Sequence, residues 1–224
     1  MKSKNSSYVL TAAVLGCAAM AIVDGIIRPD YAIKSAIKII FFLAVPFLCS
    51  ISNKELEFRS LFHFNKKGIL VALSMGIIVY GAILGGYFLL KDIFDFGGVA
   101  TSLSSNAGVD SSNFVFVSIY ISFANSFLEE IFFRGFIFKN LKKHGSLRLA
   151  YIFSSLAFAL YHVAMMIGWF SFPLTVLLIA GLAIGGTIFN YLSERFETVF
   201  VPWGVHMFAN FAINTIGFIL LGAG

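Results

Sequence analysis

Seven long apolar runs, separated by short polar or charged segments, dominate the 224-residue chain. Each is close to the length of about 20 residues that a helix needs to cross the hydrocarbon core of a bilayer. In chain order the runs are Tyr8–Ile27, Tyr31–Ile51, Gly68–Leu90, Phe114–Phe138, Leu149–Phe170, Phe172–Leu192 and Thr198–Leu220. The pattern predicts an all-α fold, a polytopic membrane helix bundle with about seven transmembrane helices.

The first two runs are less regular than the others. Lys34 and Lys38 interrupt the first half of the second run, and we expect their long side chains to reach the membrane interface. The first run contains Leu-Gly-Cys ending at Cys17, which is similar to a bacterial lipoprotein cleavage site. We predict an uncleaved first span instead, because apolar residues continue to Ile27 and further spans follow.

Two local patterns suggest how the spans pack. Glycines lie one helical turn apart at Gly81 and Gly85, and again at Gly181 and Gly185. This spacing predicts close approach of neighbouring helices. The segment 53–67 mixes charged and aromatic residues, so we expect a short amphipathic helix along the inner interface.

The composition supports a membrane protein and sets its orientation. Hydrophobic residues make up 59% of the chain and charged residues 12%, which leaves too few polar side chains to cover a soluble surface. The net charge of +5 does not point to nucleic acid, because the basic residues lie in short loops. With the N-terminus inside, eleven Lys and Arg residues fall in cytoplasmic segments and four outside. The positive-inside rule therefore predicts a multi-pass protein of the cell membrane, in contact with lipid, with a cytoplasmic N-terminus and an outer C-terminus.

The fourth run differs from the others because its middle carries three formal charges, on Glu129, Glu130 and Arg134. Burying such groups at the centre of a bilayer costs several kcal/mol, on the order of the insertion scales, and marks a functional site by default. Glu130 and Arg134 are four residues apart, so we expect a guanidinium–carboxylate pair with two bonds. Glu129 lies about 100° around the helix, on the face of Asn125, with no cation on its own helix. We predict that Glu129 is free for chemistry; the alternative is a buried ion network that only fixes helix packing.

Two later runs carry histidine at similar depth. His162 follows Phe158 by four residues, and His206 precedes Asn210 by four, so each pair shares a helix face. At about 1.5 Å of rise per residue, Glu129 lies about 15 Å from the inner end of its span, His206 about 12 Å and His162 about 20 Å. A lone histidine in an apolar helix is usually a packing residue. Here three spans each carry an ionisable side chain, Glu129, His162 and His206, at similar depth, and this predicts that the three side chains converge.

A carboxylate and two imidazoles around a water molecule suggest a hydrolytic site with two possible mechanisms. Glu129 is a general base in the first, and His162, or His206 with Asn210, stabilises the oxyanion. In the second, His162 and His206 bind a zinc ion, with Glu129 as a third ligand or as the base. The absence of a compact metal motif such as HExxH favours the version without metal. The expected cofactor is therefore none or zinc.

Three motifs carry a resemblance to a known family. Glu129-Glu130-xxx-Arg134, Phe158-xxx-His162 and His206-xxx-Asn210 occur in this order on hydrophobic runs. Together they resemble the motifs of the CPBP family, which contains CAAX-type prenyl endopeptidases and the bacteriocin-processing or self-immunity proteins also called Abi. The resemblance covers roughly residues 114–220, about half of the chain.

The resemblance implies an intramembrane endopeptidase that cleaves a peptide or protein substrate in or at the membrane, of metalloprotease or glutamate type. It assigns water activation to Glu129, places His162, His206 and Asn210 around it, and makes Glu130, Arg134 and Phe158 supporting residues. We predict a single integral-membrane domain over residues 1–224, with a catalytic core at about 114–220 and N-terminal helices at 8–91.

Two other functions remain open. The first is a non-catalytic bacteriocin self-immunity or scaffold protein on the same fold. The second is a proton- or ion-coupled carrier in which buried Glu and His form a relay. Carriers usually contain structural repeats, and the sequence shows no clear internal repeat.

Overall fold

A computed structural model describes residues 2–58, 62–99 and 113–222, and every regular element in these residues is helical. The α-helices are α1 (Lys2–Ile22), α2 (Tyr31–Ile39), α3 (Val45–Ser52), α4 (Lys66–Leu90), α6 (Phe114–Tyr120), α7 (Ser126–Glu130), α8 (Lys139–His144), α9 (Leu147–Tyr161), α10 (Val163–Met166), α11 (Phe172–Phe196) and α12 (Phe200–Gly222). Four π-helical segments adjoin them: η1 (Val23–Ile27), η2 (Ile40–Ala44), η4 (Ile121–Asn125) and η5 (Ile131–Phe138).

All seven predicted spans are present in the described residues as helices long and apolar enough to cross a membrane. The chain is therefore a multi-pass membrane helix bundle, as the apolar runs predict. The largest difference is in the fourth span, which continues to His144 instead of ending at Phe138. The polar helix α8 adds these residues, because helical geometry continues past the point where the apolar run stops.

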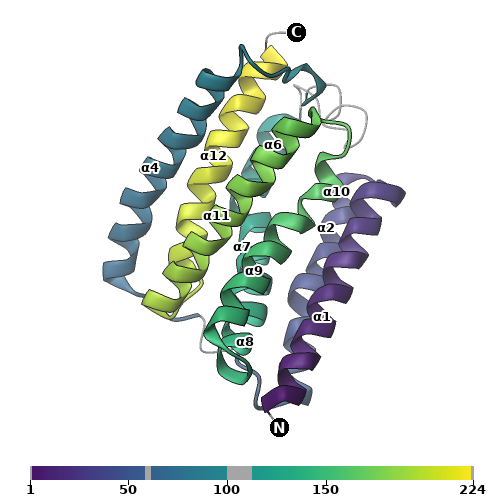
Figure 1. Cartoon of the computed structure of the whole chain (residues 1–224), viewed down its shortest axis with the longest axis vertical. Helices are drawn as coiled ribbons and strands as arrows, with labels where there is room; N and C mark the ends of the chain where they lie inside the picture. The colour runs from purple at the N-terminus through teal and green to yellow at the C-terminus, as the bar shows by residue number, and fades with distance from the viewer. Residues whose placement is uncertain (1, 59–61, 100–112, 223–224) are drawn as a thin grey trace.

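The long helices α4, α12, α11 and α9 lie side by side in that order (Figure 1). α4 lies along α12, α12 packs against α11, and α11 packs against α9. α1 packs against α8 and α9. The N-terminus and the C-terminus lie at opposite ends of the bundle (Figure 1), as an odd number of spans requires.

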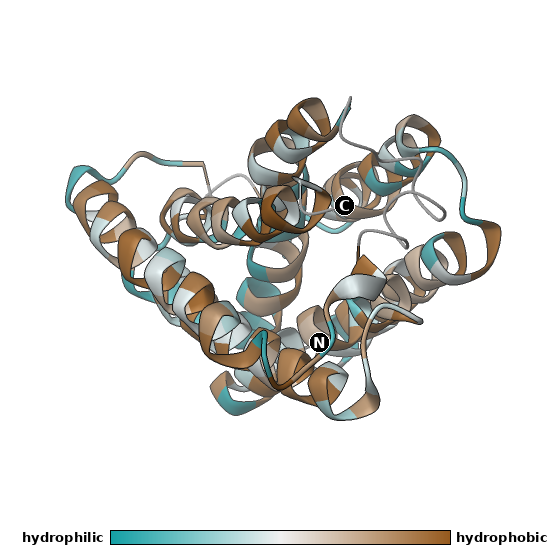
Figure 2. Cartoon of the chain, turned by 90° about the horizontal axis from the view of Figure 1, so that it is seen from above, coloured by the Kyte–Doolittle hydropathy of each residue, from teal (hydrophilic) through white to brown (hydrophobic). Residues whose placement is uncertain are grey.

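The fourth span is the central one. Of an 18-residue apolar stretch in this span, 44% is buried inside the protein, against 17–33% of the corresponding stretches in the other six spans. Its aromatic residues Phe132, Phe133 and Phe136 are almost fully buried. The other helices keep large apolar side chains on the outside, such as Leu89 at 78% exposure and Phe172 at 81%. Hydrophobic residues occur along the helices throughout the bundle (Figure 2). Such a surface suits contact with lipid.

The predicted close approach at the paired glycines is wrong. A Cβ atom added at Gly81, Gly85, Gly181 or Gly185 would meet no other atom within 4 Å. These glycines point away from the neighbouring helices in the described structure. The close contact on α11 lies one residue later, at Gly186, where a Cβ atom would lie 3.1 Å from Cα of Ser155.

The predicted amphipathic helix over 53–67 is also absent from the described part of that segment, 53–58 and 62–65, which forms turns and irregular chain. The side chain of Asn140 on α8 explains the path near Glu57. Its Oδ1 accepts a bond from the backbone N–H of Glu57 at 2.7 Å, and its Nδ2 donates to the backbone carbonyl of Glu57 at 3.0 Å. Because both backbone groups bind a side chain, they are not used in helical hydrogen bonds.

Candidate active site

The structure brings together the acid of the fourth span and the histidines of the fifth and seventh. Glu129, in α7, is 1% exposed. Its Oε2 atom lies 3.7 Å from Nε2 of His162 and 3.8 Å from Nε2 of His206. Both imidazoles therefore approach the same carboxylate oxygen. A single water molecule can bond to Oε2 and to either ring at these separations.

The second nitrogen of each ring fixes how it faces Glu129. Nδ1 of His162 lies 2.7 Å from the backbone oxygen of Phe158, and Nδ1 of His206 lies 2.8 Å from Oε1 of Glu130. Each partner oxygen accepts a hydrogen bond, so each Nδ1 carries the proton. In the neutral rings Nε2 then presents its lone pair to the space beside Glu129.

Phe158 supports the site in two ways. It lies four residues before His162, and its carbonyl accepts the ring N–H described above. Its own ring meets the His162 ring edge to face at 4.7 Å and the His206 ring at 5.7 Å. The predicted pairing of Phe158 with His162 on one helix face is therefore observed, and the same aromatic ring also reaches His206.

Glu130 and Arg134 form the predicted pair, but through one bond instead of two. Nη1 of Arg134 donates to Oε1 of Glu130 at 3.2 Å. Nη2 donates to the backbone carbonyl of Gly186 on α11 at 3.3 Å, so it is not directed at the carboxylate. The guanidinium carbon lies 4.3 Å from the ring centre of Phe158 and 5.0 Å from that of Phe189. Arg134 thus joins the fourth, fifth and sixth spans.

The expectation that Lys38 reaches the membrane interface is wrong. Its side chain is 4% exposed, and its Nζ atom lies 2.6 Å from Oε1 of Glu129 and 2.5 Å from Oδ1 of Asn125. Glu129 lacks a cation on its own helix, as expected, but receives one from α2. An ionisable residue eight positions into an apolar span was a signal of function in the sequence. Lys34, one turn earlier, forms an ion pair with the buried Asp24.

Asn210 lies on the same face of α12 as His206 but contacts a different part of the fourth span. Its Nδ2 donates to the backbone carbonyl of Ile121 in η4 at 3.1 Å. One turn later, Nδ2 of Asn214 donates to the carbonyl of Ser118 at 3.1 Å. These bonds dock α12 onto the fourth span, and a role of Asn210 at an oxyanion stays a prediction.

The zinc alternative stays a prediction, and two features of the described residues count against it. The part of the chain that the structure describes contains no group of three or more His, Cys, Asp or Glu side chains placed to hold one. Glu129 already binds the ammonium of Lys38 through Oε1. A dication on its other oxygen would lie close to that positive charge.

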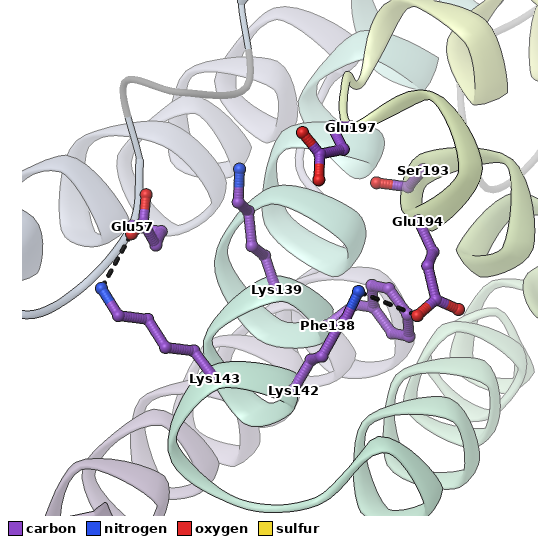
Figure 3. A pocket seen from close by; sticks show the side chains of 8 residues that line it. All are labelled: Glu57, Phe138, Lys139, Lys142, Lys143, Ser193, Glu194 and Glu197. Atoms are coloured by element: carbon purple, nitrogen blue, oxygen red, sulfur yellow. Dashed lines mark hydrogen bonds and ion pairs between the residues drawn. The ribbon is translucent and has the colours of Figure 1, made fainter.

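A separate pocket of about 330 Å³ lies at the end of the bundle formed by α8 and the C-terminal end of α11 (Figure 3). Lys142 pairs with Glu194 at 2.8 Å, and Lys143 pairs with Glu57 at 2.7 Å. Three lysines and three glutamates line it together with Phe138 and Ser193, so its formal charge is balanced. None of the predicted site residues lines this pocket.

Comparison with protein families supports the predicted resemblance. Residues 111–212 match the family described as type II CAAX prenyl endopeptidase Rce1-like. The matched residues include all seven predicted site residues, and the match confirms the similarity to the CPBP family. Lys38 lies outside the matched residues. No curated protein and no solved structure matches the chain.

Proposed function

We propose that this chain, whose residues 111–212 are similar to the CAAX-type membrane proteases, is an intramembrane endopeptidase in which Glu129 activates the attacking water. The observation that carries the proposal is the approach of two imidazole Nε2 atoms to one buried oxygen of Glu129. That Oε2 atom is buried and makes no hydrogen bond to the described residues. An acceptor of this kind is ready to take a proton from a bound water.

In the proposed first step, a water held by Oε2 of Glu129 and Nε2 of His162 attacks the carbonyl carbon of the scissile peptide bond. A bond forms between the water oxygen and that carbon, and one water proton passes to Glu129. The carbonyl oxygen becomes an oxyanion, which needs a hydrogen-bond donor. In the second step the carbon–nitrogen bond breaks, and Glu129 returns the proton to the leaving amine.

His206 is the better candidate for the oxyanion donor. Its Nδ1 atom lies on the carboxylate of Glu130, whereas that of His162 lies on a neutral backbone carbonyl. A bond to a carboxylate holds a ring more firmly than a bond to a neutral carbonyl. In this proposal Nε2 of His206 donates to the oxyanion, while His162 uses the lone pair of its Nε2 to orient the water.

The substrate reaches the site from the side of His162 in this proposal. The His162 side chain is 16% exposed, compared with 6% for His206 and 1% for Glu129. His162 also lies between the last residue of α9 and the first residue of the short helix α10. The proposed substrate is a peptide or protein segment in or at the membrane. The name of the matched family points to CAAX sequences, in which the cleaved bond lies near the C-terminus of the substrate.

The experiment that tests this function is cleavage of a fluorogenic peptide by the purified full-length protein in lipid vesicles. The peptide ends in a CAAX sequence and is prepared with and without a farnesyl group. Glu129→Gln keeps the size of the side chain but removes the base, so we expect a loss of cleavage of at least 100-fold with normal membrane abundance. Glu57→Gln, in a half-exposed ion pair far from the site, is the matched control. Wild-type cleavage by Glu129→Gln would contradict the proposal.

A second candidate function is a non-catalytic self-immunity or scaffold protein. The observation in its favour is the ion pair of Glu129 with Lys38, because a network that only fixes helix packing also neutralises its buried acids. In that case Glu129→Gln would retain biological activity, whereas a peptidase would lose it.

A further inference from the structure

The ammonium group of Lys38 is surrounded by two hydrogen-bond acceptors and two aromatic rings. Its ammonium group donates to Oε1 of Glu129 and to Oδ1 of Asn125. It also lies 5.4 Å from the ring centre of Phe42 and 5.1 Å from that of Tyr161. Carboxylate, amide and aromatic faces together form a site built for a cation in low dielectric.

The same contacts fix the orientation of the Glu129 carboxylate. Asn125 donates from Nδ2 to Oε1 of Glu129 at 3.0 Å, so Lys38, Asn125 and Glu129 form a closed ring of hydrogen bonds. Both donors converge on Oε1. The other oxygen, Oε2, is therefore turned toward His162 and His206.

A charged partner also matters for the chemistry of a buried acid. Removing an isolated carboxylate from water is so unfavourable that the group becomes neutral instead. A neutral Glu129 could not accept a proton from water. An ammonium group at 2.6 Å offsets part of the cost of burying a carboxylate charge.

We propose that Lys38 is a positioning residue of the active site, which holds Oε1 of Glu129 so that the charged Oε2 faces the two histidines and the attacking water. The proposal rests on the proposed peptidase function. It assigns part of the site to α2, in the N-terminal half of the chain, although the predicted site residues all lie on later helices. Lys38 acts through Glu129 and does not touch the substrate.

The chain offers a matched control for Lys38. Lys34 is on the same face of α2, one turn earlier, and it also forms an ion pair with a buried acid, Asp24. Both side chains are lysines in the same span, but only Lys38 contacts Glu129. A general effect of removing a lysine of α2 that pairs with a buried acid should therefore appear in both variants.

The test measures kcat and KM for cleavage of the CAAX peptide by Lys38→Met, Lys38→Arg and Lys34→Met in lipid vesicles. We expect kcat of Lys38→Met to fall at least tenfold with KM within twofold of wild type, because ground-state substrate binding does not involve the lysine. Lys38→Arg keeps a cation but moves its donor atoms, so its kcat should lie between those of wild type and Lys38→Met. Lys34→Met should keep kcat within twofold.

A wild-type kcat in Lys38→Met would overturn the assignment, and so would an equal fall of kcat in Lys34→Met. Wild-type protein and Glu129→Gln are measured in parallel. If the wild-type protein cleaves the peptide and Glu129→Gln does not, the proposed function holds. An unchanged kcat in Lys38→Met then overturns only the role assigned to Lys38. If Lys38→Met does not accumulate in membranes, the smaller neutral variant Lys38→Gln replaces it with the same two criteria.

Discussion

The two adjacent glutamates of α7 are held by different cations, and each leaves its Oε2 atom without a hydrogen bond to the described residues. Oε1 of Glu130 is shared by Arg134 and His206, at 3.2 and 2.8 Å. Oε1 of Glu129 binds Lys38, while its Oε2 is left toward the imidazoles. The neighbouring carboxylates therefore approach different nitrogens of the His206 ring, Nε2 for Glu129 and Nδ1 for Glu130. Only Glu129 presents an oxygen to both imidazole Nε2 atoms.

Replacing Glu130 should destabilise the protein rather than only reduce its activity. Glu130→Gln leaves the guanidinium of Arg134, which is 0% exposed, without a carboxylate, and breaking a buried pair in this way costs roughly 3–5 kcal/mol. We expect lower membrane abundance and a lower Tm in detergent. The control Glu57→Gln breaks a half-exposed pair with Lys143, which is worth about 0–1 kcal/mol. Equal Tm values for the two variants would contradict this account of Arg134.

Activity should survive removal of divalent metals. In the proposed chemistry the base is Glu129 and the donor is His206, and the described residues hold no fitting metal site. We expect kcat to stay within twofold after dialysis against EDTA and after addition of 1,10-phenanthroline. Loss of activity that zinc restores would instead assign a metal to Glu129, His162 and His206.

The sequence was sufficient to predict that Glu129, His162 and His206 converge, because ionisable groups stand out in apolar runs and their depths can be compared. It was not sufficient for Lys38. Spacing along a helix predicts which residues share a face, but it does not predict that the side chain of Lys38 on α2 reaches Glu129 on α7. The partner of Asn210 was missed for the same reason, since Ile121 offers only a backbone carbonyl.

At the scale of elements, π-helical segments flank α7 on both sides. η4 precedes it and η5 follows it. A π-helix changes the register of side chains, and such segments occur frequently at functional sites. The carbonyls of Ile121 and Phe123 in η4 accept bonds from Asn210 and Trp203 on α12. The seventh span is thus docked onto the fourth at the point where its regular helix is interrupted.

The contact between α9 and α11 should not tolerate an added methyl group at Gly186. Its Cβ atom would lie 3.1 Å from Cα and 3.3 Å from the carbonyl oxygen of Ser155, which are backbone atoms, and 3.4 Å from Nη2 of Arg134. We expect Gly186→Ala to lower stability by about 1–3 kcal/mol, the usual effect of overpacking. Gly181→Ala, where nothing lies within 4 Å, should be neutral or slightly stabilising. Thermal unfolding in detergent measures both, and equal Tm values would contradict the contact.

For the whole molecule, the seven spans could be predicted because the length and apolarity of each run are sufficient for that conclusion. The packing of the spans could not. The glycine pairs on α4 and α11 suggested contacts, but they face outward. Helix faces in a membrane are apolar both toward lipid and toward protein, so hydrophobicity alone does not distinguish them.

The orientation of the bundle stays a prediction, and the burial of Lys38 strengthens it. Without Lys38, three basic residues remain in the predicted outer segments, Arg28, Lys34 and Lys91. In a variant without Cys17 and Cys49, we expect Lys142→Cys to be labelled by a membrane-impermeant maleimide only from the cytoplasmic side. Arg28→Cys should be labelled only from the outside. The reverse pattern would overturn the predicted orientation.

The link from Lys38 to Glu129 crosses from the helices that precede the matched region into the region itself. The first half of the chain is therefore more than a lipid anchor for the second. A shortened protein that starts at the fourth span would carry an acid without its counter-ion. A chimera with N-terminal helices from another protein would be active only if those helices place a cation where Lys38 of α2 lies. A substitution at Lys38 or at Glu129 therefore needs a matching substitution at the other position, although the two residues lie in different halves of the chain.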